Sequence, residues 1–419
     1  MTVRALVPAM LGAIFWLTPP SSPSGRAAEA PGLEFDVSLR ERATYLSALE
    51  WDADSSDAGW FWTQRLLLNT YWEGENASGK LTLLSALSDG IESSPIEENR
   101  LAIQEAYVDL SLGDATLRIG REELKFGSQR LVGWRDGTNV RRTFDSLRLT
   151  QTHGDWVVDT LYAQEVVVEP RGTFNDESSS GRSLAGVYAT GRTALTSIDA
   201  YYLWSRRDER PTIEGTANQR RHTVGTRVFG DAGPLFWNWE AALQFGEHGD
   251  SDIRAWTLAT NTGYRFDALW SPSIMLSANV SSGDSARDDG RLETFDALYP
   301  RGSYFSEIAQ IGPSNFYNVN PYLGLQPRED IVISMDLNWF WRNELNDGVY
   351  GPPGNIVRLP QDSRKRLVST AFSASIEWEA TEKLFLGFVM TYSHPGAFIE
   401  DTGPSDNALF TEFSLEYAF

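Results

Sequence analysis

The chain has 419 residues, no cysteine and a formal net charge of -21, from 36 Lys+Arg against 57 Asp+Glu. The lack of cysteine excludes disulfides, thiolate catalysis and sulfur-ligated metals. The acidic balance argues against sequence-independent nucleic-acid binding, which needs a basic face. The basic residues are mostly arginine, because Lys80, Lys125, Lys365 and Lys383 are the only lysines and 36 − 4 leaves 32 arginines. A guanidinium binds carboxylate or phosphate bidentately, so this bias favours fixed anion sites.

The N-terminus has the pattern of a secretory signal peptide. Arg4 precedes an apolar run from Ala5 to Leu17, and Ala28-Glu29-Ala30 is a small-x-small cleavage site. The alternative is a membrane anchor, but the run is shorter than the roughly 20 residues that a spanning helix needs. We therefore expect a cleaved signal peptide over 1–30 and a single β-barrel domain over 31–419, starting near Pro31.

The rest of the chain alternates between apolar and polar residues. From Ile331 to Trp341 every second residue is apolar, and Ser334, Asp336 and Asn338 lie between them. Successive strand residues point to opposite faces, so one face suits lipid and the other water. A soluble β-sandwich would alternate in the same way. The 15 Trp, 15 Tyr and 21 Phe favour the barrel, which uses aromatic residues as girdles at the membrane interfaces.

The spacing predicts about 18 strands, an even number as expected of a single-chain bacterial barrel. They are expected near 34–46, 60–72, 79–88, 101–112, 115–121, 144–151, 156–166, 183–191, 195–205, 221–229, 234–246, 253–265, 271–282, 317–326, 331–342, 365–378, 383–393 and 410–419. Short turns are expected at 113–114, 152–155, 191–194, 230–233 and 379–381, and long loops at 122–143, 167–182, 206–220, 283–316, 343–364 and 394–409. Short periplasmic turns that alternate with long extracellular loops are typical of an outer-membrane barrel and not of a sandwich.

The last strand supports the same fold. Phe413, Leu415, Tyr417 and Phe419 fall on one face of 409–419, with Glu412, Ser414 and Glu416 on the other. A chain that ends in an aromatic residue on an alternating strand resembles the terminal assembly signal of outer-membrane barrels. The sequence therefore predicts an all-β, transmembrane antiparallel barrel in the outer membrane of a Gram-negative bacterium.

Two blocks resemble the alginate export family of outer-membrane proteins. The first is Leu117-Arg118-Ile119-Gly120-Arg121, continuing through Gly127-Ser128-Gln129-Arg130 to Asp145. The second is Ala297-Leu298-Tyr299-Pro300-Arg301-Gly302-Ser303-Tyr304-Phe305 with Ile311-Gly312-Pro313-Ser314-Asn315 and Asn320-Pro321. The resemblance extends over most of the mature chain. It implies an 18-stranded barrel with an arginine-rich lumen and, in the best-known member, export of the polyuronate alginate. Many members occur without an alginate pathway, so the substrate is implied only loosely.

The first block contains a dense basic loop. Arg121, Lys125, Arg130, Arg135, Arg141 and Arg142 crowd the connection 122–143, with Glu122, Glu123 and Asp136 as counter-charges. We expect this loop on the extracellular side, where it folds into the lumen and constricts it. The alternative is a surface loop that binds lipopolysaccharide phosphates or is solvated.

Strand parity gives further candidates for the lumen wall. An arginine that faces lipid near the midplane costs roughly 2–4 kcal/mol, so arginines in the middle of strands should point inward. Parity gives the predicted pore-lining residues Arg40, Arg65, Arg118, Arg148, Arg227, Arg265 and Arg342, with Glu105 and Asp109. The basic loop adds Arg121, Arg130, Arg141 and Arg142 as predicted pore-lining or substrate-binding residues. Asp336 also faces inward by parity. Each arginine alone is as well explained by a structural ion pair, but rings of arginine are typical of anion pores.

Catalysis and metal binding find little support. His153, His222, His248 and His394 are the only histidines, and none lies in a recognisable pattern with a serine nucleophile. The segment Asp52 to Asp57 departs from the EF-hand spacing and lacks its glycine, which favours a solvated loop over a cation site. We expect no enzyme activity, metal or cofactor.

The sequence thus predicts a passive outer-membrane channel with an arginine-rich lumen. Export of an acidic, alginate-like polysaccharide is the sharper hypothesis. The alternatives are a selective porin for small organic anions and a closed barrel whose loops bind partners at the surface. Expected partners are outer-membrane lipid, lipopolysaccharide, the anionic polysaccharide or small anions, and periplasmic secretion proteins; nucleic acid is not among them.

Overall fold

The computed structural model describes residues 32–193 and 196–419. The predicted signal peptide 1–30, its cleavage near Pro31 and the turn residue Ala194 lie outside the described residues and stay predictions. The regular secondary structure of the described chain is almost entirely β-strand, and the helix within it, α1 (Ala397–Thr402), has 6 residues. None of the described helical structure is long and apolar enough to cross a membrane.

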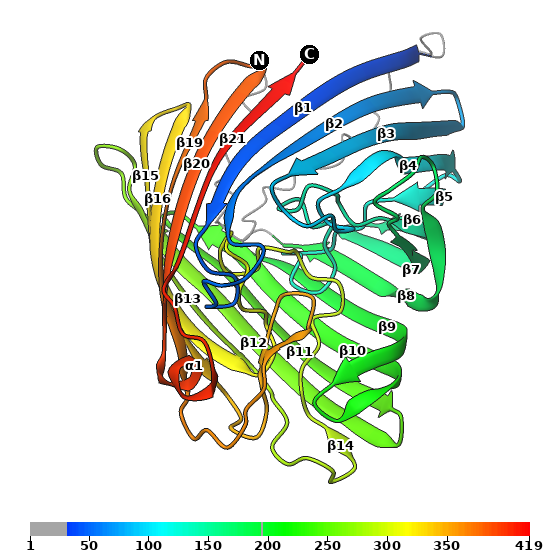
Figure 1. Ribbon diagram of the computed structural model, residues 1–419. Helices are drawn as coiled ribbons and strands as arrows, with labels where there is room; N and C mark the ends of the chain where they lie inside the picture. The colour runs from blue at the N-terminus through cyan, green and yellow to red at the C-terminus, as the bar shows by residue number, and fades with distance from the viewer. Residues whose placement is uncertain (1–31, 194–195) are drawn as a thin grey trace.

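Eighteen long strands of the described residues form one closed antiparallel sheet (Figure 1). They are β1 (Gly32–Leu46), β2 (Gly59–Glu73), β3 (Ala77–Asp89), β4 (Asn99–Ser111), β5 (Ala115–Glu122), β6 (Phe144–His153), β7 (Trp156–Val167), β8 (Glu177–Arg192), β9 (Thr196–Thr212), β10 (Gly215–Ala232), β11 (Leu235–His248), β12 (Ser251–Arg265), β13 (Ser273–Ser281), β15 (Phe316–Arg328), β16 (Ile331–Arg342), β19 (Leu367–Glu379), β20 (Leu384–Pro395) and β21 (Ala408–Ala418). The barrel closes where β1 pairs with β21, from Ser38↔Ala418 to Leu46↔Phe410. Closure leaves no unpaired sheet edge, which a hydrocarbon environment requires.

Three short strands lie in the long connections. β14 (Arg291–Leu292) pairs in parallel with β12, and β17 (Val349–Tyr350) forms a small hairpin with β18 (Ile356–Arg358). The predicted 18-stranded antiparallel barrel is confirmed.

One predicted loop is wrong, and a second is too long. The segment 206–220 is not a long loop, because β9 and β10 continue through it and leave only 213–214 as the turn. The loop predicted at 167–182 is shortened by β8, which begins at Glu177. Both errors have one cause. Where a hairpin extends beyond the apolar band, both of its faces are polar, so hydrophobic alternation no longer marks the strand.

The two rims of the barrel differ in their connections. The rim at which β1 begins and β21 ends, uppermost in Figure 1, carries short turns such as 112–114, 154–155 and 329–330. The opposite rim carries the long connections 123–143, 282–315, 343–366 and 396–407, although 213–214 and 249–250 are also short there. Outer-membrane barrels have short turns on the periplasmic side, so we name the first the periplasmic rim and the second the outer rim.

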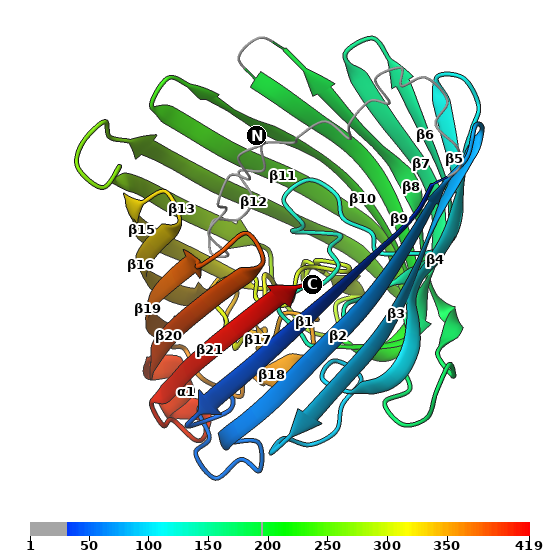
Figure 2. The ribbon, with the colours of Figure 1, turned by 90° about the horizontal axis from the view of Figure 1, so that it is seen from above.

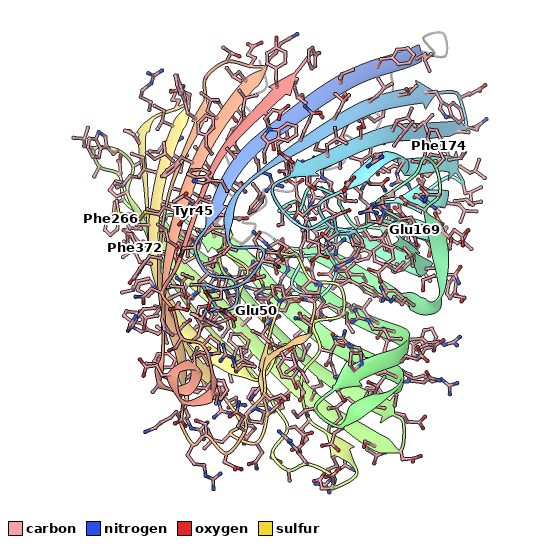
Figure 3. The ribbon with its side chains drawn as sticks, in the orientation of Figure 1. Tyr45, Glu50, Glu169, Phe174, Phe266 and Phe372 are labelled. Atoms are coloured by element: carbon pink, nitrogen blue, oxygen red, sulfur yellow. The ribbon has the colours of Figure 1, made fainter. Side chains whose placement is uncertain are left out.

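The outer face of the sheet is apolar. Ile119, Leu147 and Leu243 are each about half exposed or more, whereas their neighbours in the strands are less accessible. Exposed aromatic residues lie near the periplasmic rim at Trp72, Trp156, Tyr264 and Trp378. Figure 3 shows Phe266 and Phe372 on the outside of the wall. An apolar band with aromatic residues at its margin is the surface that a barrel presents to lipid.

Candidate functional site

Two long connections meet inside the barrel. The backbone N–H of Gly133 donates to the carbonyl of Tyr299 (2.8 Å), and the N–H of Tyr299 donates to Leu131 (2.9 Å). Val132 and Tyr299 form a parallel bridge. Seen from above, the loop after β5 crosses the interior of the ring of strands (Figure 2). The structure thus places 122–143 in the lumen, paired with 282–315, rather than on the surface; we call these two segments the plug.

A hydrophobic cluster holds the plug against one side of the wall. It joins plug residues to inward-facing residues of β6 to β9, β11 and β12. The plug contributes Leu124, Phe126, Leu131, Val132, Phe295, Ala297, Leu298 and Tyr299, and the wall contributes Phe144, Leu161, Ala163, Leu184, Tyr188, Tyr201, Leu203, Ala242 and Ala255. This much buried apolar surface makes the plug part of the folded core.

Gly127 shows how closely the plug approaches the wall. Its φ of +52° lies in the left-handed region, and an added Cβ would stand 2.4 Å from the hydroxyl oxygen of Tyr188 on β8. Only glycine fits both conditions.

Several predicted arginines anchor the plug or brace the wall behind it. Arg130 donates to Glu240 (2.9 Å), and Arg142 lies 3.3 Å from Glu165 and donates to the Pro300 carbonyl (3.1 Å). Arg227 donates to Asp199 (2.6 Å), which also accepts from Tyr188. Arg142 and Arg227 are each 5% exposed. These two side chains are buried and hold the plug and the wall in place, so the structure corrects their predicted pore-lining role.

A second set of predicted residues pairs along the wall itself. Arg118 makes two bonds of 2.7 Å to Asp109 and one of 3.2 Å to Glu122. Arg148 reaches Glu122 at 2.7 Å. Two further pairs, Arg121 with Asp145 (2.8 Å) and Lys80 with Glu105, continue this network over β3 to β6. Arg118 and Arg148 face inward as strand parity predicts, because their neighbours Ile119 and Leu147 are exposed on the outer face. Arg121 and Asp145 share the parity of Ile119 and Leu147 and lie on the outer side of the wall, so the structure corrects the predicted pore-lining role of Arg121.

Arg40, Arg65 and Arg141 converge on a single carboxylate. Arg65 donates to Asp136 at 3.0 Å, Arg141 at 2.6 Å, and Arg40 lies at 4.0 Å while it donates to the Asp136 carbonyl at 2.9 Å. Burial would raise the pKa of the Asp136 carboxyl, but the charges of Arg141, Arg65 and Arg40 together hold it well below its ordinary value. The carboxylate is therefore ionised at every physiological pH, and three guanidinium groups share it.

These three arginines border a large open cavity. Its volume is about 710 Å³, and it opens toward the periplasmic rim between β1, β21 and the β19–β20 turn. Lys383 lines it with them, and Glu379, Glu382 and Glu416 supply negative charge. Glu416 is 4.0 Å from Arg40. The cationic side chains that line the cavity are thus nearly matched in number by carboxylates. The three arginines, however, lie together at Asp136.

The other side of the lumen is uncharged over most of its area. Inward positions of β12 to β20 hold amide and hydroxyl side chains, namely Asn261, Ser277, Asn279, Asn318, Asn320, Ser334, Asn338, Ser373, Ser375 and Thr391. The predicted inward Asp336 lies among them, 6% exposed, and accepts a bond of 2.8 Å from Asn320. A smaller hollow of about 70 Å³ separates this neutral wall from Arg130 and Arg301 of the plug.

Arg342 was predicted to line the pore, but it is buried against a loop at the outer rim. It is 0% exposed, and its guanidinium donates to the carbonyls of Leu345, Asp347, Ser363 and Lys365. The structure therefore corrects its pore-lining role to that of an anchor for the connection 343–366. Strand parity gave the right face, but at the outer rim that face meets folded loop instead of solvent. Arg265, at the periplasmic end of β12, stacks over the ring of Phe236 at 4.4 Å.

Some inward arginines were missed. Arg207 and Arg210 lie 3.7 and 3.4 Å from Asp296 of the plug, and Arg221 donates to the Thr294 carbonyl. Burial would raise the pKa of the Asp296 carboxyl, but Arg210, Arg207 and Arg221 hold it far below its ordinary value. Arg207 and Arg210 lie where a loop was expected. Arg42, which donates to the Gly137 carbonyl at 2.7 Å, and Arg221 share the parity of predicted residues and could have been found by it.

The described histidines have no catalytic partners. His222 bonds the Tyr202 hydroxyl, His248 bonds Thr212, and His394 bonds Asn407, while His153 ends β6. In the segment 52–57, Asp52 accepts a bond from its own loop. Within 32–193 and 196–419, no group of three or more His, Asp or Glu side chains is arranged to hold a metal ion.

A family model described as alginate export matches residues 48–410. The chain belongs to the alginate export family. The two stretches on which the resemblance rested, 117–145 and the region from Ala297, contain the two plug segments that pair inside the barrel. By its description, the family is one of export proteins. No curated protein sequence matches the chain significantly.

Solved outer-membrane channels of Pseudomonas aeruginosa share the fold. OccD3 (OpdP) has a TM-score of 0.65 at 10% identity, covering 92% of this chain and 91% of that chain. OccK2 (OpdF) in complex with glucuronate has a TM-score of 0.63 at 9% identity, covering 92% and 98%. OpdK with vanillate has a TM-score of 0.62 at 9% identity, covering 92% and 98%. At these identities the likeness is one of fold.

Proposed function

We propose that the protein is a passive outer-membrane channel for anions, and that it exports an acidic polysaccharide related to alginate. The family assignment supports the polysaccharide, and the closed barrel with an apolar outer face supports the membrane. The observation that supports an anionic substrate is the convergence of Arg40, Arg65 and Arg141 on Asp136 beside the 710 Å³ cavity.

The geometry of that cluster suits a moving anion. Each guanidinium has five N–H donors, and Asp136 and the loop carbonyls accept only part of them. A carboxylate on a passing polymer therefore finds donors without displacing the whole network. The paired Asp136 and Glu416 keep the local field moderate, which favours release as well as entry.

Two alternatives have specific support. The structures of OccK2 with glucuronate and of OpdK with vanillate favour a porin for small organic anions. A closed barrel that binds partners through its outer loops is favoured by the packing of the plug inside the lumen. No nucleotide-binding pattern is evident in the sequence, so the driving force for export would come from a concentration gradient or from periplasmic secretion partners.

Planar-bilayer recordings of the purified barrel test the proposal. We expect open channels whose reversal potential in a KCl gradient has the sign of anion preference, and we expect mannuronate oligomers to block the current. A cation-selective reversal potential would rule out the anion channel, and absence of conductance would favour the closed barrel. Block by small carboxylates but not by the oligomers would favour the porin.

A further inference from the structure

The hollow between the plug and the neutral wall has two chemically different sides. The plug side carries Arg130 and Arg301, with Tyr304 beside them. The wall side carries five asparagines, Asn261, Asn279, Asn318, Asn320 and Asn338, which we call the asparagine band. They come from β12, β13, β15 and β16.

Strand register assembles the band. Asn279 stands opposite Asn318, and Ser277 stands opposite Asn320. Residues that are directly opposite on one face of an antiparallel pair lie within side-chain contact. The amides accordingly form a chain, in which Asn279 donates to Asn318 (2.8 Å) and Asn318 donates to Asn338 (2.9 Å). The band is therefore a fixed array of oriented amides.

The array has hydrogen-bonding capacity beyond its own bonds. An asparagine side chain offers two N–H donors and an oxygen with two lone pairs. The chain from Asn279 to Asn338 uses one donor of Asn279, one donor of Asn318 and one lone pair each of Asn318 and Asn338. The N–H donors and lone pairs that remain on this chain can bind an alcohol hydroxyl, which donates one bond and accepts others. Asn320 offers only its oxygen, because its N–H groups donate to Asp336 and to the Leu337 carbonyl.

The charge on the opposite side complements this pattern. Arg130 is held by Glu240 at 2.9 Å, which fixes its guanidinium at the hollow. Arg301 is positioned by its backbone, whose N–H donates to the Gln129 carbonyl at 3.1 Å. A solute with a carboxylate at one edge and several hydroxyls at the other would meet guanidinium groups and amides at once.

We propose that the asparagine band is a hydroxyl-binding subsite, which makes the passage selective for polyhydroxylated carboxylates over carboxylates that lack hydroxyls. The inference rests on the proposed anion channel and adds to it a chemical criterion for the substrate. A site built to hydrogen-bond hydroxyls rejects an analogue that lacks them, because its buried polar groups are then left unpaired.

Gluconate and hexanoate form a matched pair of probes, since both are six-carbon monocarboxylates and only gluconate carries hydroxyls. In single-channel recordings, we expect half-block of the native channel at an about tenfold lower concentration of gluconate than of hexanoate. Asn318→Leu should bring the two concentrations together while the KCl conductance and anion preference stay unchanged. Arg301→Gln should weaken block by both anions alike.

Ser373→Ala is the matched control, because Ser373 faces inward on the same neutral wall but does not line the hollow. It should keep the gluconate preference. If Asn318→Leu fails to assemble, as shown by loss of heat-modifiable migration, Asn279→Leu tests the same band from β13. Equal block of the native channel by the two probes overturns the hydroxyl-binding subsite and leaves the anion channel standing. A channel without anion preference overturns the proposed function instead.

Discussion

The two sides of the lumen use polar side chains for different purposes. On the charged side, from β3 to β11, the inward arginines are paired with carboxylates such as Asp109 and Asp199. The plug is packed there, over a hydrophobic cluster. On the neutral side, from β12 to β20, amides and hydroxyls face the space that the plug leaves.

The difference shows that the number of luminal arginines does not measure the free positive charge. A buried arginine needs a carboxylate or several carbonyls to offset its desolvation, so most of these side chains are committed to holding the plug and wall. The cluster at Asp136 differs, because its three guanidinium groups border an open cavity, with Glu123 at 3.6 Å from Arg141 and Glu416 at 4.0 Å from Arg40 as further counter-charges. We therefore expect substrate to pass this cluster and the neutral side.

The largest effect is expected from releasing the plug. Val132 is 0% exposed and bridges to Tyr299. Val132→Asp would bury an unpaired charge, at a cost on the order of 3–5 kcal/mol, and so detach the two segments from each other. We expect single-channel conductance to rise severalfold and anion preference to fall.

Thr173→Asp, which adds the same charge to an exposed loop, is the control and should leave conductance unchanged. Native conductance in Val132→Asp would mean that the plug does not limit the passage.

The next effect separates anchoring from conduction. Arg342→Met removes a buried guanidinium that satisfies four loop carbonyls, so we expect the barrel to lose on the order of 2–4 kcal/mol of stability. The reversal potential should stay native, because Arg342 does not reach the passage. Thermal melting and bilayer recording measure the two quantities.

The control is Arg364→Met, because Arg364 lies in the same connection but is exposed. This variant should melt at the same temperature as the native protein. A shifted reversal potential in Arg342→Met would show that Arg342 does line the pore.

A smaller effect is expected at the Asp136 cluster. Arg141→Gln removes one of three cations at the cavity, and we expect the anion-to-cation permeability ratio to fall about twofold in low salt. Arg148→Gln, which removes an arginine of the wall network instead, should change the ratio less. Equal effects of the two variants would contradict the contrast between clustered and paired arginines.

The smallest effect concerns pH. Asp284 lies in the connection 282–315, and burial, then the charges of Asp347 and Glu214, raise the pKa of its carboxyl to about 8. The folded state therefore keeps a proton that the unfolded chain loses near pH 4. The local fold should be most stable in acid and weaken as the pH rises toward about 8.

Protease cleavage of 282–315 should therefore be slower at pH 5.5 than at pH 8.5. Asp284→Asn should remove this dependence, whereas Asp289→Asn at an exposed site should retain it. Equal cleavage rates of the native protein at both pH values would contradict the raised pKa.

Much of the fold was predictable because the strands of a membrane barrel have a two-residue alternation of apolar and polar side chains that is visible in the sequence. Each wall strand alternates lipid-facing and lumen-facing residues, so 331–342 and 410–419 were placed within a few residues of β16 and β21. Parity likewise put Arg118 and Arg148 on the inner face. Strand parity failed at 206–220, where Arg207 and Arg210 lie on the end of β9 that is polar on both faces.

The arginine-rich lumen was therefore determined by the sequence, but the use of each arginine was decided by tertiary structure. Alternation says that Arg40, Arg65 and Arg342 point inward, because a charge that faces lipid costs free energy. It cannot say what they meet there. The plug arises from contacts between segments more than 150 residues apart, such as Arg142 with Pro300. Those contacts enclose Arg142, and the connection 343–366 encloses Arg342. Arg40 and Arg65 instead border the cavity, together with Arg141 of the plug.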